Sequence, residues 1–164
     1  MTEHFSIAEY ERSDTARRHG WDNRVPPGWI GNARQTIDML ERIRAALWHW
    51  RGFECPMHIT SGYRSLAVNR AVGSADNSSH MLAMAADWIS PLAGTPTEIC
   101  RFLAEHVEAL QIGQICNEFP GGDGDGWVHT GVQIPDRDIN RVITIDRDAS
   151  GKVVTLPGVV GSIA

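Results

Sequence analysis

The order of the periodic segments limits the fold of this sequence more than any other feature does. Two segments with helical spacing come first, and three segments with a strand-like pattern follow, at about residues 112–118, 127–134 and 141–147. Helices that precede a run of strands favour an α+β fold with a central, mainly antiparallel sheet flanked by helices. No repeat, low-complexity tract or linker divides the chain, so we expect one domain over residues 1–164.

The two helices are marked by different signals. The first follows a helix-start pair, Asn32 and Gln35, carries apolar residues at helical spacing and ends at Gly52. The second has Thr95 at the capping position, proline at the first helical position and glutamate at the third. Its helical spacing of apolar residues continues to Leu110.

Shorter elements are expected in the remaining segments. Residues 1–31 carry turn signals and should wrap the core without forming long elements. A turn signal, Asp-Ala-Ser-Gly, predicts that Val153 and Val154 return as a hairpin arm, so residues 141–164 are expected to extend the sheet. The other predicted elements are a strand at residues 57–60, a helix at 65–72 and a polar loop at 73–79.

Composition argues against several classes of protein. The 15 Lys and Arg against 20 Asp and Glu give a net charge of −5, and no basic stripe occurs, so binding to nucleic acid is not expected. No apolar run is long enough to span a membrane, and the N-terminus lacks the pattern of a secretory signal. Cys55, Cys100 and Cys116 form no CxxC pair, which argues against a disulfide framework or zinc knuckle. The sequence therefore predicts a soluble protein made in the cytoplasm.

Common catalytic motifs are absent, and a set of histidines and carboxylates remains. The sequence has no GxSxG elbow, no GxxxxGK[ST] phosphate loop and no HExxH pair. His80 and Asp87 are seven residues apart, too far on a straight helix to share one metal ion. A loop that feeds a strand would bring them together, and the small residues Ala83, Ala85 and Ala86 would allow the close approach. The alternative is that Asp87 caps a turn or pairs with an arginine.

A second histidine completes a candidate metal site. His129 lies in a strand pattern, on the same face as Trp127. Two histidines and one aspartate would leave one position open on a zinc ion, as a catalytic zinc requires. The alternative is that His129 is a hydrogen-bonded core or edge residue.

Two carboxylates that precede His129 are candidate general bases. If the strands on either side of residues 120–126 pair as a hairpin, Glu118 comes near His129. Asp125 is the second candidate. The alternatives are a solvent-facing glutamate at a strand end, and a solvated loop or weak cation site at Asp123 and Asp125.

Arg64 is a candidate substrate-binding residue. Its rigid fork of N–H donors suits a substrate carboxylate or a developing oxyanion, and it precedes a polar loop. The alternative is a structural ion pair with Asp76 or with another carboxylate.

Four segments carry motifs that are specific in combination: Ile59–Ser65, Val68–Gly73, Ser78–Asp87 and Trp127–His129. In this order and spacing they resemble the zinc D-Ala-D-Ala carboxypeptidases. The segment from His4 to Asn23 is similar to the N-terminal pattern of one branch, the small single-domain peptidases of phage and prophage genes. The resemblance covers about residues 4–134.

The resemblance implies a hedgehog/DD-peptidase-like fold and one Zn²⁺ per chain, held by His80, Asp87 and His129. It also implies that Arg64 binds or polarises the substrate, and its general base is best matched by Glu118. Ser78, in the SxH motif, is implied to bind substrate. The implied function is a zinc metallopeptidase acting on stem peptides of bacterial peptidoglycan, as a carboxypeptidase or an endolysin-type endopeptidase. The alternative is a non-catalytic zinc-binding module, such as a phage tail or virion component.

The sequence departs from the family pattern at two places. Ala83 stands where the family usually has glycine, and an insertion at residues 120–125 lengthens the loop before His129. Many relatives keep the base three residues before that histidine, where this chain has Gly126. Because no secretory signal is recognised, we expect the protein to reach the cell wall after lysis, by export or in a virion.

Overall fold

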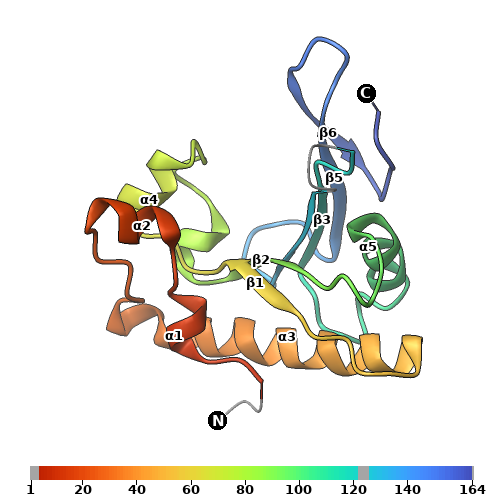
Figure 1. Cartoon of the computed structure of the whole chain (residues 1–164), viewed down its shortest axis with the longest axis horizontal. Helices are drawn as coiled ribbons and strands as arrows, with labels where there is room; N and C mark the ends of the chain where they lie inside the picture. Colours follow the sequence, from red (N-terminus) through yellow and green to blue (C-terminus); the bar gives the residue numbers. More distant parts are fainter. Residues whose placement is uncertain (1–3, 122–125, 164) are drawn as a thin grey trace.

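The central element of the fold is a mixed sheet. A computed structural model describes residues 4–121 and 126–163 of the chain. Within these residues six strands form one sheet in the order β1-β2-β4-β3-β5-β6 (Figure 1). Every neighbouring pair is antiparallel except β3 and β5, which are parallel, so the prediction of a mainly antiparallel sheet is confirmed. The strands are β1 (His58–Ser61), β2 (Ala85–Ile89), β3 (Gln114–Glu118), β4 (Trp127–Gly131), β5 (Arg141–Arg147) and β6 (Val153–Pro157).

Helices cover the sheet and its flanks. The long helix α3 runs along the base of the molecule, α5 lies beside the sheet, and α1, α2 and α4 gather at the opposite end (Figure 1). Their bounds are α1 (Ile7–Tyr10), α2 (Asp14–His19), α3 (Ile30–Arg51), α4 (Leu66–Ala71) and α5 (Pro96–Glu105), with 3₁₀ turns η1 (Pro27–Trp29) and η2 (Ser79–Leu82). No helix among the described residues is both long and apolar enough to cross a membrane.

The main core lies on one face of the sheet. Leu40 of α3 and Leu103 of α5 belong to the same buried cluster as Trp88 and Val128, which are paired across β2 and β4. Because successive side chains of a strand point to opposite faces, the residues that precede and follow Trp88 and Val128 project to the other side of the sheet. The core therefore occupies one face and leaves the other available for a site.

The start of α3 differs from the prediction. The helix begins at Ile30, directly after the turn η1, and its N-cap residue, Trp29, makes no side-chain capping bond. Asn32 does not cap the helix; its side-chain amide donates a hydrogen bond of 2.9 Å to the carbonyl of Leu82. The predicted end at Gly52 is confirmed, where a left-handed φ of 78° closes the helix.

The capping box of α5 is confirmed, but the helix is shorter than its apolar spacing predicts. Thr95 accepts from the backbone of Glu98, and the Glu98 carboxylate accepts from the backbone of Thr95. The helix ends at Glu105, and Val107 and Leu110 pack against the core from the turns that follow. Tertiary packing thus reproduces helical spacing beyond the end of the helix.

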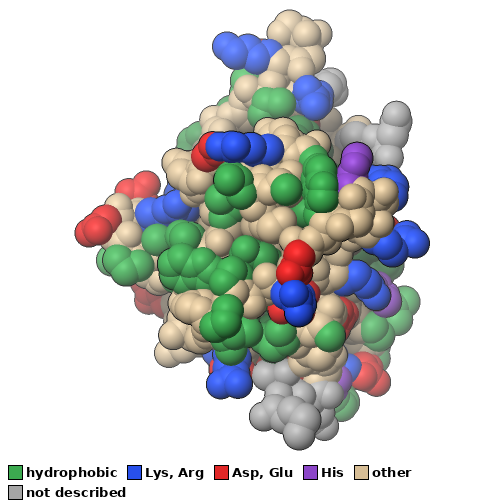
Figure 2. All heavy atoms as spheres, turned by 90° about the vertical axis from the view of Figure 1, so that its left-hand side faces the viewer, with side chains coloured by type: hydrophobic (Ala, Val, Ile, Leu, Met, Phe, Trp, Pro, Cys, Tyr) green, Lys and Arg blue, Asp and Glu red, His purple; other side chains and the backbone are tan. Residues whose placement is uncertain are grey.

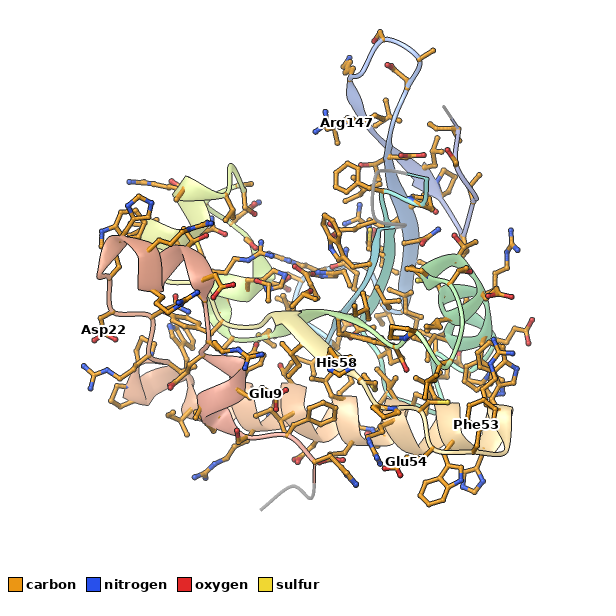
Figure 3. All side chains as sticks on the ribbon, viewed as in Figure 1. Glu9, Asp22, Phe53, Glu54, His58 and Arg147 are labelled. Carbon is orange, nitrogen blue, oxygen red and sulfur yellow. The ribbon has the colours of Figure 1, made fainter. Side chains whose placement is uncertain are left out.

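The shorter predicted elements are largely confirmed. The predicted strands at 112–118 and 127–134 are longer than β3 and β4, and the hairpin arm at Val153 and Val154 is the start of β6. The N-terminal 31 residues contribute only short elements. The β5–β6 hairpin projects beyond the rest of the sheet, and Arg147 donates 3.0 Å to the carbonyl of Gly151 near its tip (Figures 1 and 3).

Charged and apolar side chains are mixed on the face at the α2 and α4 end. Figure 2 shows hydrophobic patches there that are interrupted by arginines and carboxylates. The exposed apolar residues at this end include Leu66 and Val72, which lie at the two ends of α4. No charge of one sign dominates this view.

Replacing Thr95 with alanine should destabilise the fold by ~1 kcal/mol, since the hydroxyl that caps α5 is lost. Thr95→Ser keeps the hydroxyl and should stay within a few tenths of a kcal/mol of the original protein. Urea unfolding followed by circular dichroism measures both. Equal stability of the alanine variant and the parent would show that the box contributes nothing.

Candidate metal centre

A turn between η2 and β2 brings His80 and Asp87 together. His80 lies in η2, and Ala83 then takes a left-handed conformation, with φ of 55°, before the chain enters β2 at Ala85. Helix α3 holds this turn, because the Thr36 hydroxyl donates a hydrogen bond of 3.0 Å to the Ala83 carbonyl. The predicted loop feeding a strand is confirmed, and it explains how residues seven apart in the chain meet.

Strand pairing adds His129 to the group. Asp87 of β2 and His129 of β4 are directly opposite each other in the antiparallel ladder. Oδ1 of Asp87 lies 2.8 Å from Nδ1 of His129 and 3.2 Å from Nε2 of His80. The two imidazole nitrogens lie 3.3 Å apart. The structure therefore gathers the three predicted ligands into one group that could hold a metal ion.

Burial and charge set the protonation of this group. All three side chains are buried. Burial lowers the pKa of His80, because a charged imidazole is disfavoured away from water. Burial opposes the charge of Asp87 as well, but the two histidines outweigh it and hold its pKa well below the usual range. For His129, burial works against protonation, and the hydrogen bond and charge of Asp87 raise its pKa overall.

The orientation of His80 depends on Gly62, for which the sequence predicted no individual role. Nδ1 of His80 donates 2.7 Å to the carbonyl of Gly62, so its Nε2 faces Asp87. A Cβ at Gly62 would lie 2.2 Å from the carbonyl oxygen of Tyr10. Tyr10 is itself buried and donates 2.7 Å from its hydroxyl to the carbonyl of Ala85. The glycine of the Ser-Gly-Tyr-Arg segment was the available signal, because its close backbone contact excludes any side chain.

Arg64 lies against the same group. Its Nη2 is ion-paired with Oδ2 of Asp87, and its Nε donates 2.8 Å to the hydroxyl of Ser61. Asp76, which the sequence offered as a structural partner of Arg64, pairs with Arg70 at 2.7 Å. The partner of Arg64 is therefore not Asp76 but another carboxylate, the buried one of Asp87.

Glu118 lies beside His129, as the predicted hairpin requires. Strands β3 and β4 pair with Glu118 opposite Trp127, and Oε1 of Glu118 is 3.8 Å from Nδ1 of His129. Its side chain is 18% exposed, so it does not stand at a solvent-facing strand end. Burial, followed by the charge of Asp87, raises its pKa. Asp123 and Asp125 lie outside the described residues.

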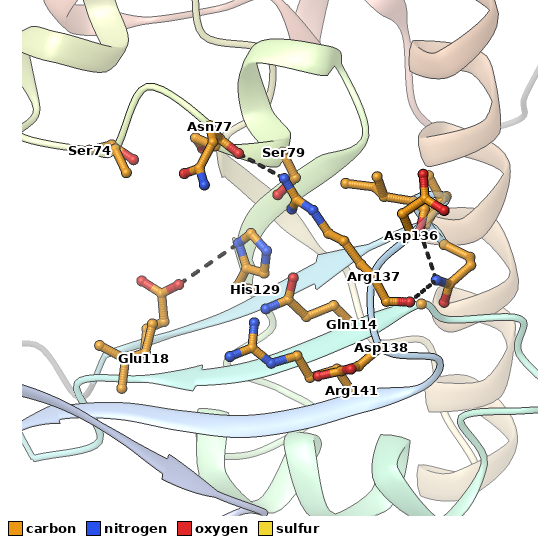
Figure 4. Close-up of a pocket in the computed structure, with 17 residues that line it drawn as sticks. Ser74, Asn77, Ser79, Gln114, Glu118, His129, Asp136, Arg137, Asp138 and Arg141 are labelled. Carbon is orange, nitrogen blue, oxygen red and sulfur yellow. Dashed lines mark hydrogen bonds and ion pairs between the residues drawn. The ribbon is translucent and has the colours of Figure 1, made fainter.

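A cavity of about 540 Å³ opens next to these side chains. Glu118 and His129 line it together with Ser78 and Ser79. Figure 4 shows Glu118, His129 and Ser79 at its wall. The hydroxyl of Ser78 also caps η2 by accepting 3.4 Å from the backbone of His80. A substrate in this cavity would contact both the glutamate and the histidine.

A buried group of two histidines and one aspartate, with a glutamate beside it at the wall of a cavity, is an arrangement typical of metal-dependent hydrolases. Residues 3–119 match the family model described as Peptidase M15. This chain therefore belongs to the peptidase M15 family, which is that of the zinc D-Ala-D-Ala carboxypeptidases, and it is a peptidase-type hydrolase. Comparison with curated proteins gives no match. The matched residues include Arg64, His80, Asp87 and Glu118, whereas His129 follows them.

The thiols should be unreactive in the folded protein. Cys55, Cys100 and Cys116 are buried, and burial raises the pKa of each thiol. Iodoacetamide at pH 8 should modify none of them in the native state and all three after unfolding, as counted by mass spectrometry. Rapid modification of a native thiol with loss of activity would instead indicate thiol chemistry.

Proposed function

We propose that this protein is a zinc-dependent peptidase that hydrolyses peptide bonds in the stem peptides of bacterial peptidoglycan, and that His80, Asp87 and His129 are its zinc ligands. The observation that carries the proposal is the convergence of these three side chains beside Glu118. Membership of the peptidase M15 family supports both the metal and the class of substrate. We also propose the hedgehog/DD-peptidase topology for the fold.

The donor set fits zinc. Two imidazoles and one carboxylate suit this borderline-soft ion better than they suit calcium or magnesium. A tetrahedral ion with bonds of ~2.1 Å holds its ligand atoms about 3.4 Å apart. The three separations here, 2.8, 3.2 and 3.3 Å, are close to that value. Zinc bound there would polarise the scissile carbonyl and lower the pKa of the attacking water.

Glu118 is proposed as the general base. The β3–β4 ladder fixes its backbone, and its carboxylate lies beside His129 at the wall of the cavity. From there it can accept the proton of the attacking water and later give it to the leaving amine. A purely structural zinc site is closed by four protein ligands and needs no such neighbour, so the position of Glu118 favours an enzyme over a non-catalytic module.

Arg64 and Ser78 are proposed to hold the substrate. The contacts of Arg64 with Asp87 and Ser61 use Nη2 and Nε, and within the described residues Nη1 has no partner. This nitrogen can bind the oxygen of a substrate carbonyl or carboxylate while the guanidinium stays fixed. Ser78 lines the cavity next to the turn that carries His80.

The purified protein should contain one zinc per chain, and His80→Ala should lose most of it in elemental analysis. The remaining two ligands would be unable to hold the ion tightly, since each ligand contributes to the site. The matched control is His49→Ala, which replaces an exposed histidine of α3 and should keep one zinc per chain. Full zinc content in the His80 variant would refute the ligand assignment.

Glu118→Gln should keep its zinc and its fold but lose turnover by at least ~100-fold, the lower range for general-base catalysis. Asp125→Asn should stay near the parent rate. The assay follows a stem pentapeptide ending in D-Ala-D-Ala and a cross-linked stem peptide by mass spectrometry. Release of D-alanine identifies a carboxypeptidase, and internal cleavage identifies an endopeptidase. A zinc-loaded protein that cleaves neither peptide would contradict the proposed function.

A further inference from the structure

Arg141 is on the same face of the sheet as Glu118 and His129. The parallel ladder of β3 and β5 places Arg141 beside Gln114 and Ile145 beside Glu118. Paired residues of neighbouring strands project to the same face, and so do residues two or four apart on one strand. Figure 4 shows the Arg141 guanidinium next to the Gln114 side chain, on the side of the strands that carries the glutamate.

The same cavity that contains the catalytic candidates also extends to Arg141. Glu118 and His129 line it, and so do Gln114, Arg137 and Arg141. Four residues of strand separate the backbones of Glu118 and Gln114, which corresponds to ~13 Å, and the Arg141 side chain extends from the Gln114 level toward Glu118 (Figure 4). An extended peptide of about four residues spans that length. A bound peptide can therefore have its scissile bond at Glu118 and a residue up to four positions away at Arg141.

The charged groups that line the cavity with Arg141 differ in how they are used. Nη2 of Arg137 donates 2.8 Å to the carbonyl of Asn77, so Arg137 ties two walls of the cavity together. Asp136 and Asp138 also line the cavity, and neither is paired with Arg141. The Arg141 guanidinium makes no hydrogen bond or ion pair with any residue in 4–121 or 126–163. It is therefore a cationic fork that faces the cavity with its donors free.

From this arrangement we infer that Arg141, assisted by the Gln114 amide, binds a carboxylate of the peptide substrate within about four residues of the scissile bond. The guanidinium presents parallel N–H donors that match a carboxylate. The arginines and aspartates that line this part of the cavity nearly balance in charge, so long-range attraction of an anion adds little. In the sheet order the ligand strands β2 and β4 lie between the segment after β1, which carries Arg64, and β5. Arg64 would therefore serve the reacting group and Arg141 a remote acidic group. This inference rests on the proposed function.

The test compares Arg141→Gln with Arg101→Gln, which removes the same charge from an exposed position of α5. The substrates are a stem pentapeptide and a set of its derivatives in which each carboxyl group in turn is a carboxamide. With the unmodified peptide, Arg141→Gln should raise KM by about tenfold or more and leave kcat within about twofold, as expected for a lost charge-assisted hydrogen bond. Arg101→Gln should match the parent.

One carboxamide derivative should abolish the difference. With the peptide that lacks the contacted carboxylate, the parent and Arg141→Gln should have the same KM, because neither can form the interaction. That derivative identifies the carboxylate. The inference would be overturned if Arg141→Gln had the same KM as the parent with every peptide. It would also be overturned if the KM of Arg141→Gln exceeded that of the parent by the same factor with every carboxamide derivative.

A binding measurement separates this inference from the proposed catalysis. Zinc-loaded Glu118→Gln, with and without Arg141→Gln, is titrated with the same peptides by isothermal titration calorimetry. Adding Arg141→Gln should weaken binding of the unmodified peptide by about tenfold. It should leave unchanged the affinity for the derivative that lacks the contacted carboxylate. If the parent protein hydrolyses none of the peptides but this pattern holds, the hydrolytic function fails and the carboxylate site stands. If hydrolysis is normal but the pattern is absent, the carboxylate site fails alone.

Discussion

The carboxylate of Asp87 is buried in contact with two imidazoles and a guanidinium. These groups come from four separate segments of the chain, which must all be folded for the contacts to form. A buried carboxylate is costly unless cations or donors surround it, and removing one partner of such a group commonly costs ~3–5 kcal/mol. The turn η2, the strands β2 and β4 and the segment after β1 must all be in place for those partners to meet. The group that could hold a metal is thus also a tertiary crosslink of the fold.

The turn beside this group is held from outside the site. Ala83 takes a left-handed conformation that costs a residue with a side chain about 1 kcal/mol or more, and glycine is usual here in the relatives that the sequence resembles. The Ala83 methyl is fully buried, which offsets part of that cost by packing. The hydrogen bonds from Asn32 and Thr36 to the turn come from α3. The longest helix therefore both covers the core and positions the backbone between His80 and Asp87.

Local signals were predictable from the sequence, and signals that depend on tertiary contacts were not. The capping box at Thr95 is satisfied within four residues, so its chemistry is visible in the sequence. Asn32 also matches a local capping pattern, but its side-chain amide donates to the distant carbonyl of Leu82. The predicted start of α3 was wrong for this reason. The proximity of His80, Asp87 and His129 was predictable because these residues lie in motifs that resemble those of a known family. The position of Arg141 was not, because it depends on the register of the parallel pair β3–β5.

That parallel pair has a consequence for how the protein can diversify. The residues matched to the family end at 119, yet strand β5 and the loop before it build one wall of the cavity. The group of His80, Asp87 and His129 is complete at β4, whereas Arg141 comes from β5, the next strand along the chain. Substitutions confined to β5 and the loop before it would therefore change one wall of the cavity and leave the group of His80, Asp87 and His129 intact.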